Sequence, residues 1–215
     1  MSAIFLSASV PDPKRGTHYA QSADTVAIAA AVSALVHVTL GRRMLVWGGH
    51  PAITPMIWVT AENMGIDYGQ WVRLYQSLYF KDEYPEDNER FKNVTFTDAV
   101  DNDRERSLRL MRERMFNEHK FQAAVFIGGM KGILDEYELF RSMQPNASTL
   151  PVVSTGGAVL DVAKRMAPVP HDLAEDLDYV ALFHRHLAIS TKELRYPRPG
   201  EQPAKPADRL WKAPG

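Results

Sequence analysis

The sequence has no cysteine, which excludes disulfide bonds and metal sites built on thiolates. It has almost no net charge, -1 over 215 residues, so no global basic field points to nucleic acid as a partner. No apolar run approaches the ~18–20 residues of a membrane-spanning helix, and the first residues lack the features of a signal peptide. We therefore expect a cytoplasmic protein with neither a membrane nor a nucleic-acid partner.

Several common functional motifs are also missing. The segment Gly128–Gly132 is not a Walker A loop, because no Gly-Lys-Ser/Thr follows, and it does not fit the Gly-x-Gly-x-x-Gly dinucleotide fingerprint. No Gly-x-Ser-x-Gly elbow of a serine hydrolase is present. His184 and His186 lie two residues apart, which puts their rings on different faces of a helix. We expect no metal ion and no resident cofactor.

What the sequence does have is an alternation of short apolar runs with helical segments. Strands are predicted at residues 3–7, 44–47, 71–74, 94–96, 123–127 and 151–154, and helices at residues 22–40, 54–63, 103–118, 132–143, 157–166 and 176–187. This order predicts an α/β fold, a Rossmann-like, doubly wound and mostly parallel sheet flanked by helices. We expect a single domain over residues 1–194 and a proline-rich, polar tail without a core over residues 195–215.

Two junctions between a strand and a pair of glycines carry most of the functional information. One is Gly48-Gly49-His50 and the other is Gly128-Gly129-Met130-Lys131-Gly132. In an open α/β sheet such junctions bring backbone N–H groups and helix N-termini to an anionic ligand. Each, taken alone, is equally compatible with a plain turn between a strand and a helix. Further candidate contacts to phosphate or base lie in similar loops, namely Ser7, Ser9, Arg15, Thr54, Ser154, Thr155 and Gly156.

A helix rich in arginine could supply a positive charge to the same ligand. Leu108, Met111 and Met115 form its apolar stripe, and Arg112 and Arg114 flank this stripe on opposite sides. A flanking arginine can reach a phosphate with its planar guanidinium group. The spacing alone does not choose between the two arginines.

Together these segments resemble the SLOG superfamily, which includes the cytokinin-activating LOG phosphoribohydrolases. Ile4–Ser9 is similar to the first LOG strand and its serine-bearing loop, and Leu45–Gly49 is similar to the LOG segment Leu-Val-Tyr-Gly-Gly. Met111–Met115 resembles the Met-His-Glu-Arg-Lys segment, and Phe126–Glu136 resembles the Pro-Gly-Gly-x-Gly-Thr-x-x-Glu signature. The resemblance implies Arg114 and Glu136 as the functional arginine and glutamate, which would be catalytic if the protein is an enzyme.

The glycine signature departs from that of the LOG enzymes. Ile127 replaces its proline, Ile133 replaces its threonine, and one residue is inserted between Gly129 and Gly132. The form of the signature is more similar to the SLOG branch linked to prokaryotic defence and NAD-derived signals. The resemblance therefore implies binding of a nucleotide-derived ligand such as ADP-ribose, with a homodimer and a separate effector protein as expected partners. Two alternatives stay open, an N-glycoside hydrolase acting on nucleoside monophosphates or NAD-like substrates, and a partner-binding protein without a small ligand.

Overall fold

The computed structural model describes residues 2–15 and 17–212. Its centre is a six-stranded sheet in the order β4-β3-β2-β1-β5-β6, with parallel pairing throughout. The strands are β1 (Ala3–Ser9), β2 (Met44–Trp47), β3 (Val72–Ser77), β4 (Val94–Thr97), β5 (Phe121–Gly128) and β6 (Ser148–Val152). The prediction of a Rossmann-like, doubly wound parallel sheet is confirmed.

The strand order reverses direction between β1 and β5. From β1 the chain builds the sheet outward through β2, β3 and β4, and it then returns to add β5 and β6 on the other side of β1. In open α/β sheets, ligands bind outside the carboxyl ends of the strands at such a switch point. The topology therefore indicates a ligand site at the carboxyl ends of β1 and β5.

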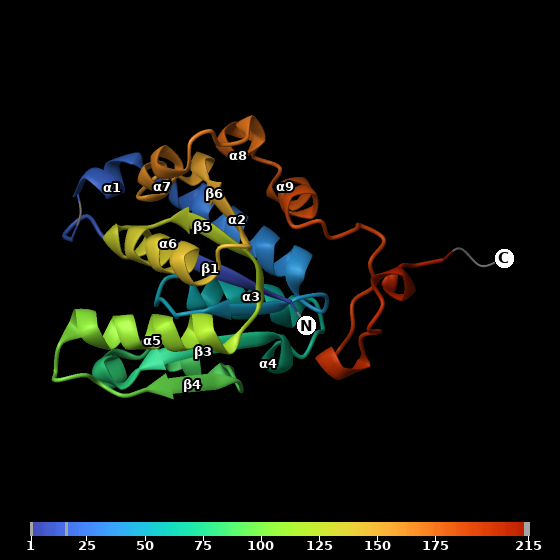
Figure 1. Ribbon diagram of the computed structural model, residues 1–215, viewed down its shortest axis with the longest axis horizontal. Helices are drawn as coiled ribbons and strands as arrows, with labels where there is room; N and C mark the ends of the chain where they lie inside the picture. The colour runs from blue at the N-terminus through green and yellow to red at the C-terminus, as the bar shows by residue number, and fades with distance from the viewer. Residues whose placement is uncertain (1, 16, 213–215) are drawn as a thin grey trace.

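Helices cover both faces of the sheet (Figure 1). The face with Ile4 and Leu6 packs on α2 (Thr25–Thr39), α3 (Thr54–Asn63) and α9 (Tyr179–His186). The face with Ala3 and Phe5 packs on α5 (Arg104–Glu118), α6 (Lys131–Met143) and α7 (Val159–Met166). Neighbouring residues of β1 thus enter different cores, as the two-residue period of a strand requires. Three shorter helices complete the fold, α1 (Thr17–Ser22), α4 (Tyr68–Trp71) and α8 (His171–Glu175).

Local sequence signals set the ends of the helices beside the site. The Asp24 side chain accepts hydrogen bonds from the N–H groups of Val26 and Ala27 and so caps the start of α2. Asp103 caps α5 in the same way, through the N–H of Arg106. Differences from the predicted bounds are small, and the largest is at β6, which begins at Ser148 and gives way to the short 3₁₀ helix η3 (Val153–Thr155).

Two irregular parts contain more structure than their composition indicates. The acidic segment between β3 and β4 forms two 3₁₀ helices, η1 (Leu78–Glu83) and η2 (Glu86–Arg90). The C-terminal segment contains η4 (Pro199–Glu201) and η5 (Pro206–Arg209) and is tied to the body by side chains. The Trp71 indole donates to the carbonyl of Tyr196, and the Gln202 amide donates to the carbonyl of Arg42. Among the helices that the structure describes, none is long and apolar enough to cross a bilayer.

Candidate functional site

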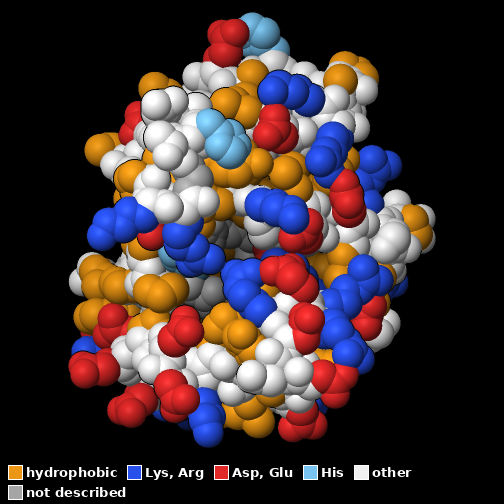
Figure 2. All heavy atoms as spheres, turned by 90° about the vertical axis from the view of Figure 1, so that its left-hand side faces the viewer, with side chains coloured by type: hydrophobic (Ala, Val, Ile, Leu, Met, Phe, Trp, Pro, Cys, Tyr) orange, Lys and Arg blue, Asp and Glu red, His pale blue; other side chains and the backbone are white. Residues whose placement is uncertain are grey.

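A cavity of about 740 Å³ opens at the carboxyl ends of the central strands. Its walls come from the ends of β1, β2 and β3, from the loop before α1, from η1, and from the facing parts of α5 and α6. Figure 2 shows that this face of the molecule is hollowed and that Lys, Arg, Asp and Glu side chains surround the hollow. The volume falls within the range of ~300–1,000 Å³ that is typical of small-molecule sites.

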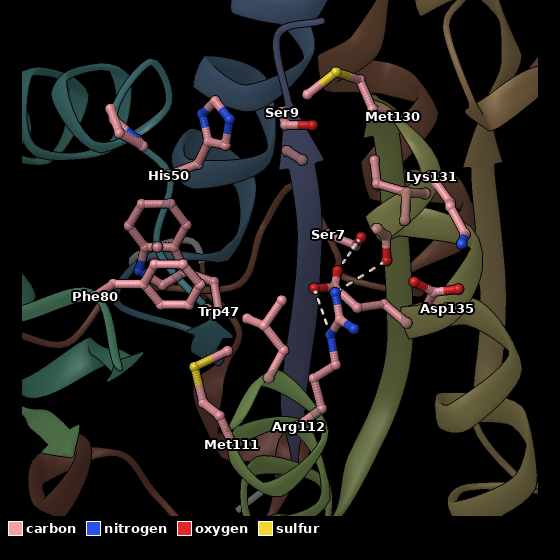
Figure 3. Close-up of a pocket in the computed structure, with 18 of the residues that line it drawn as sticks. Ser7, Ser9, Trp47, His50, Phe80, Met111, Arg112, Met130, Lys131 and Asp135 are labelled. Carbon is pink, nitrogen blue, oxygen red and sulfur yellow. Dashed lines mark hydrogen bonds and ion pairs between the residues drawn. The ribbon is translucent and has the colours of Figure 1, made fainter. Parts of the chain in front are cut away.

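A largely buried group of polar side chains in the cavity joins three elements. Ser7 of β1 donates its hydroxyl to Oε2 of Glu136 on α6 at 2.5 Å. Nε of Arg112 on α5 donates to Oε1 of Glu136 at 3.2 Å, and its Nη2 donates to the carbonyl of Gly132 at 3.2 Å (Figure 3). Arg112 is only 7% exposed. Water therefore screens this charged pair only weakly, and the hydrogen bonds to Ser7 and to the carbonyl of Gly132 hold its geometry.

The N-terminus of α6 forms the adjoining wall. Met130 is its N-cap residue and contributes no side-chain hydrogen bond to the cap. The N–H groups of Lys131 and Gly132 stand in the first turn, where a helix has no internal acceptor for them, and both residues line the cavity. The helix dipole adds partial positive charge at this point, so this wall suits a phosphate group.

Further polar side chains also line the cavity, and His50 lies across β1 from Arg112 (Figure 3). Ser9, Arg15 and His50 all line it. Nδ1 of His50 accepts a hydrogen bond from the N–H of Ala52, which leaves Nε2 of the neutral ring as a donor. Burial, and then the charge of Arg15, lower the pKa of His50 below its ordinary value. Neither Arg15 nor Lys131 makes an ion pair with a described residue, so both charges remain for a ligand.

Seven of the predicted contacts do not line the cavity; Arg114 is one of them, and the other six hold the chain together behind it. These six are Thr54, Gly128, Gly129, Ser154, Thr155 and Gly156. The N–H of Gly128 donates to Oγ1 of Thr155, and the N–H of Gly129 donates to the carbonyl of Ser9. These N–H groups therefore already have acceptors inside the protein and are not directed at a ligand. The part of the second junction that reaches the cavity is Met130–Gly132.

The remaining members of this set have equally structural roles. The Thr54 hydroxyl donates to the carbonyl of His50, and the Ser154 hydroxyl shares a hydrogen bond with that of Tyr179. Gly156 has a φ of +66°, and a Cβ there would lie 1.8 Å from the carbonyl oxygen of Ser22. Gly156 thus allows the end of η3 to pass close to the end of α1.

Arg114, the arginine implied by the resemblance, lies outside the cavity. Its side chain is 46% exposed and pairs with Glu118 on the outer surface of α5. Its Nη1 donates to the carbonyl of Phe96 on β4. Arg112, on the other flank of the apolar stripe, is the arginine that contacts Glu136. The geometry therefore replaces Arg114 by Arg112 in the candidate site.

Sequence reasoning missed the aromatic part of the cavity. Trp47 and Phe80 are both on the same side of β1 as His50 (Figure 3). Phe80 belongs to η1, and Glu83, Tyr84 and Pro85 from the same irregular segment also line the cavity. The only signal in the sequence was the group of aromatic residues in an otherwise acidic stretch. The described residues contain no group of three or more side chains that could hold a metal ion.

Comparison with known proteins identifies the family. A model of the SLOG cluster3 family matches residues 18–187, which is most of the chain and includes β2–β6 and both helices that carry the charged pair. No curated protein matches the chain. The parallel sheet, the cavity at its switch point and this match agree with one another. The chain belongs to the SLOG cluster3 family.

Proposed function

We propose that the protein binds a nucleotide-derived ligand with ribose and phosphate, such as ADP-ribose or an NAD-type molecule. One observation carries the proposal: a buried carboxylate–guanidinium pair lies beside a helix N-terminus, inside a cavity of about 740 Å³ at the switch point. The N–H groups of Lys131 and Gly132 suit phosphate oxygens, which accept hydrogen bonds. Glu136 suits the hydroxyl groups of ribose, which donate them.

Membership of the SLOG cluster3 family supports a nucleotide-related ligand. We further propose that the protein acts as a cytoplasmic sensor in a prokaryotic defence or signalling system. A homodimer and a separate effector protein would be its partners. In this view the binding energy of the ligand would be used to favour one conformation of the protein over another.

A second candidate function is hydrolysis of an N-glycosidic bond. The observation in its favour is the position of Glu136, whose carboxylate could stabilise positive charge on a ribosyl group. Each carboxylate oxygen keeps a second lone pair beside its hydrogen bond to Ser7 or Arg112, so these bonds leave room for a ribose hydroxyl or a water. The ground for preferring binding over turnover is the glycine signature, in which Ile133 replaces the threonine of the LOG enzymes and one residue is inserted before Gly132.

Calorimetry with ADP-ribose, AMP and NAD tests the proposal. We expect the wild type to bind at least one of them, Arg112→Gln to lose that binding, and Arg114→Gln to keep it. The two arginines lie on the same helix, so Arg114→Gln controls for loss of one positive charge from α5. No binding of any of these ligands by the folded wild type would contradict the proposal.

The same samples separate the sensor from the hydrolase. We expect chromatography after prolonged incubation to show intact nucleotide and no free base. Release of adenine or nicotinamide by the wild type, with its loss in Glu136→Gln, would establish the hydrolase instead.

A further inference from the structure

The cavity has two chemically different sides, separated by β1. Ser7, Arg112, Lys131 and Asp135 give one side its charge and hydrogen-bonding groups. On the other side of β1, Figure 3 places Trp47, Phe80 and His50. A ligand that fills both sides must therefore be charged at one end and flat and largely apolar at the other.

We propose that Phe80 is the stacking surface for the planar base of the ligand, and that the ligand lies across the end of β1 with its sugar phosphate toward Arg112 and α6. This inference rests on the proposed function, since it assigns an orientation within the same site. It also identifies Phe80 as the residue that selects nucleotides over simple sugar phosphates.

The surroundings of Phe80 hold its ring in place without burying it. The Arg104 guanidinium lies 5.9 Å from the ring centroid, and the Tyr79 ring meets it edge-on with centroids 4.9 Å apart. Phe80 itself is half-buried and lines the cavity. A ring that is fixed by its neighbours and open to a cavity offers stacking at a low entropic cost.

Trp47 makes the adjoining surface rigid. It is 1% exposed and packs its indole near Phe91, with ring centroids 6.1 Å apart. It lines the cavity from the end of β2, directly before Gly48 and Gly49. Trp47 therefore acts as a fixed floor, and the half-buried Phe80 is the ring that a base can contact.

The opposite orientation is unfavourable on electrostatic grounds. A base placed beside Arg112 and Glu136 would cover a charged pair with an apolar ring, and the phosphate would then face Phe80 and the carboxylate of Glu83. Glu83 and Asp135, one on each side, both make no ion pair with a described residue, so the preference rests on Arg112 and the N-terminus of α6. The base fits the aromatic side and the phosphate fits the side with the helix N-terminus.

The test compares a nucleotide with its own sugar phosphate. Binding of AMP and of ribose 5-phosphate is measured by calorimetry for the wild type, Phe80→Ala and Phe96→Ala. Phe96 is 49% exposed on β4 and does not line the cavity, so it controls for the same substitution elsewhere. We expect Phe80→Ala to weaken AMP binding by about 5- to 100-fold, the range for loss of one aromatic stacking partner. Binding of ribose 5-phosphate should change less than about twofold, and Phe96→Ala should affect neither ligand.

A second measurement decides the matter if ribose 5-phosphate binds too weakly for calorimetry. Nuclear Overhauser effects between the adenine H2 and H8 protons of AMP and the assigned ring protons of Phe80 should appear in the wild type. They should disappear in Phe80→Leu, which keeps an apolar side chain without a ring.

The outcomes separate this inference from the proposed function. If Arg112→Gln abolishes AMP binding while Phe80→Ala leaves it unchanged, the ligand site stands and the orientation is wrong. The orientation is also wrong if Phe80→Ala weakens AMP and ribose 5-phosphate equally. If the folded wild type binds none of AMP, ADP-ribose and NAD, both proposals fail.

Discussion

Arg112 and Glu136 lie 24 positions apart in the sequence, yet Nε of the first stands 3.2 Å from Oε1 of the second. The contact joins α5 to α6 on the same face of the sheet, and Ser7 of β1 completes it from below. Both charges are largely shielded from water. The stability of the protein depends on both residues of such a pair, because the removal of one partner leaves the other charge uncompensated.

The first prediction concerns the stability of this unit. Arg112→Met should lower the free energy of unfolding by about 2–4 kcal/mol, a little below the cost of breaking a fully buried pair, because Glu136 is 18% exposed. The exposed Arg114→Met should cost at most about 1 kcal/mol. Urea denaturation followed by circular dichroism measures both values.

The double variant Arg112→Met/Glu136→Gln extends this test. Removing the second charge should restore at least half of the stability lost in Arg112→Met, since no uncompensated charge then remains. It should not restore ligand binding. A double variant that is as unstable as the sum of its single variants would show that the two residues do not form a unit.

Much of the fold follows from the sequence, because the central strands β1, β2 and β5 contain short apolar runs bounded by glycine or polar residues. The prediction stopped short at β3, which continues from Leu74 through Tyr75, Gln76 and Ser77. Gln76 and Ser77 are polar and yet buried at the wall of the cavity, so a pattern of apolar residues cannot find them. At the end of β3, buried polar residues that line the cavity thus replace the apolar pattern of the strand.

The candidate site was only partly predictable for a similar reason. Ser7, Gly48, Gly49 and Glu136 line the cavity as expected, because their positions at strand ends and in the first turns of a helix follow from local sequence. The choice between Arg112 and Arg114 depends on which flank of α5 adjoins α6, and local sequence does not contain that information. Phe80 is placed by an irregular segment, whose path is set by tertiary packing.

The second prediction concerns Gly156. Gly156→Ala should destabilise the protein by more than about 2 kcal/mol, because the new Cβ would lie 1.8 Å from the carbonyl oxygen of Ser22 and the φ of +66° is unfavourable for alanine. Gly65 is the matched control, since it has a φ of +64° and a Cβ added there would meet no atom within 4 Å. Gly65→Ala should cost about 1 kcal/mol. Equal losses in thermal unfolding would contradict the close approach at Gly156.

The third prediction concerns pH and His50. Burial and the charge of Arg15 lower the pKa of His50 from 6.5, so the unfolded chain binds a proton more readily than the folded protein does. Stability should therefore fall as the pH drops below about 6.5, until the folded-state pKa is reached. His37 and His119 contribute in the same direction, because burial also lowers their pKa values.

The contribution of His50 can be isolated by substitution. The loss of unfolding free energy between about pH 7.5 and pH 5.5 should be smaller in His50→Gln than in the wild type. His171→Gln is the control, since that side chain is 84% exposed, and it should leave the loss unchanged. A pH response that is the same in the wild type and His50→Gln would contradict this contribution of His50 to stability.

The fourth prediction concerns Glu193, which ties the C-terminal segment to the sheet. Its carboxylate is 6% exposed and receives hydrogen bonds from Nη1 and Nη2 of Arg43 at 2.6 and 3.2 Å. Arg42 donates to the Glu193 carbonyl, and burial together with Arg42 lowers the pKa of Arg195 to about 10. The region thus holds several positive charges around one carboxylate. Glu193→Ala should therefore cost about 3–5 kcal/mol, since it leaves buried guanidinium groups without a counter-charge.

The matched control is Glu201→Ala in the same segment. The Glu201 side chain is 50% exposed, with its carboxylate 4.0 Å from Arg198, and its loss should change stability by less than about 0.5 kcal/mol. Urea denaturation measures both variants, and proteolysis under native conditions then reports on the segment itself. In Glu193→Ala, cleavage after residue 190 should precede cleavage of the body, because the anchor at Arg43 is lost. If the segment stays protected and the stability is unchanged, the pair of Arg43 and Glu193 does not hold the segment. The hydrogen bonds from Trp71 to Tyr196 and from Gln202 to Arg42 must then hold it instead.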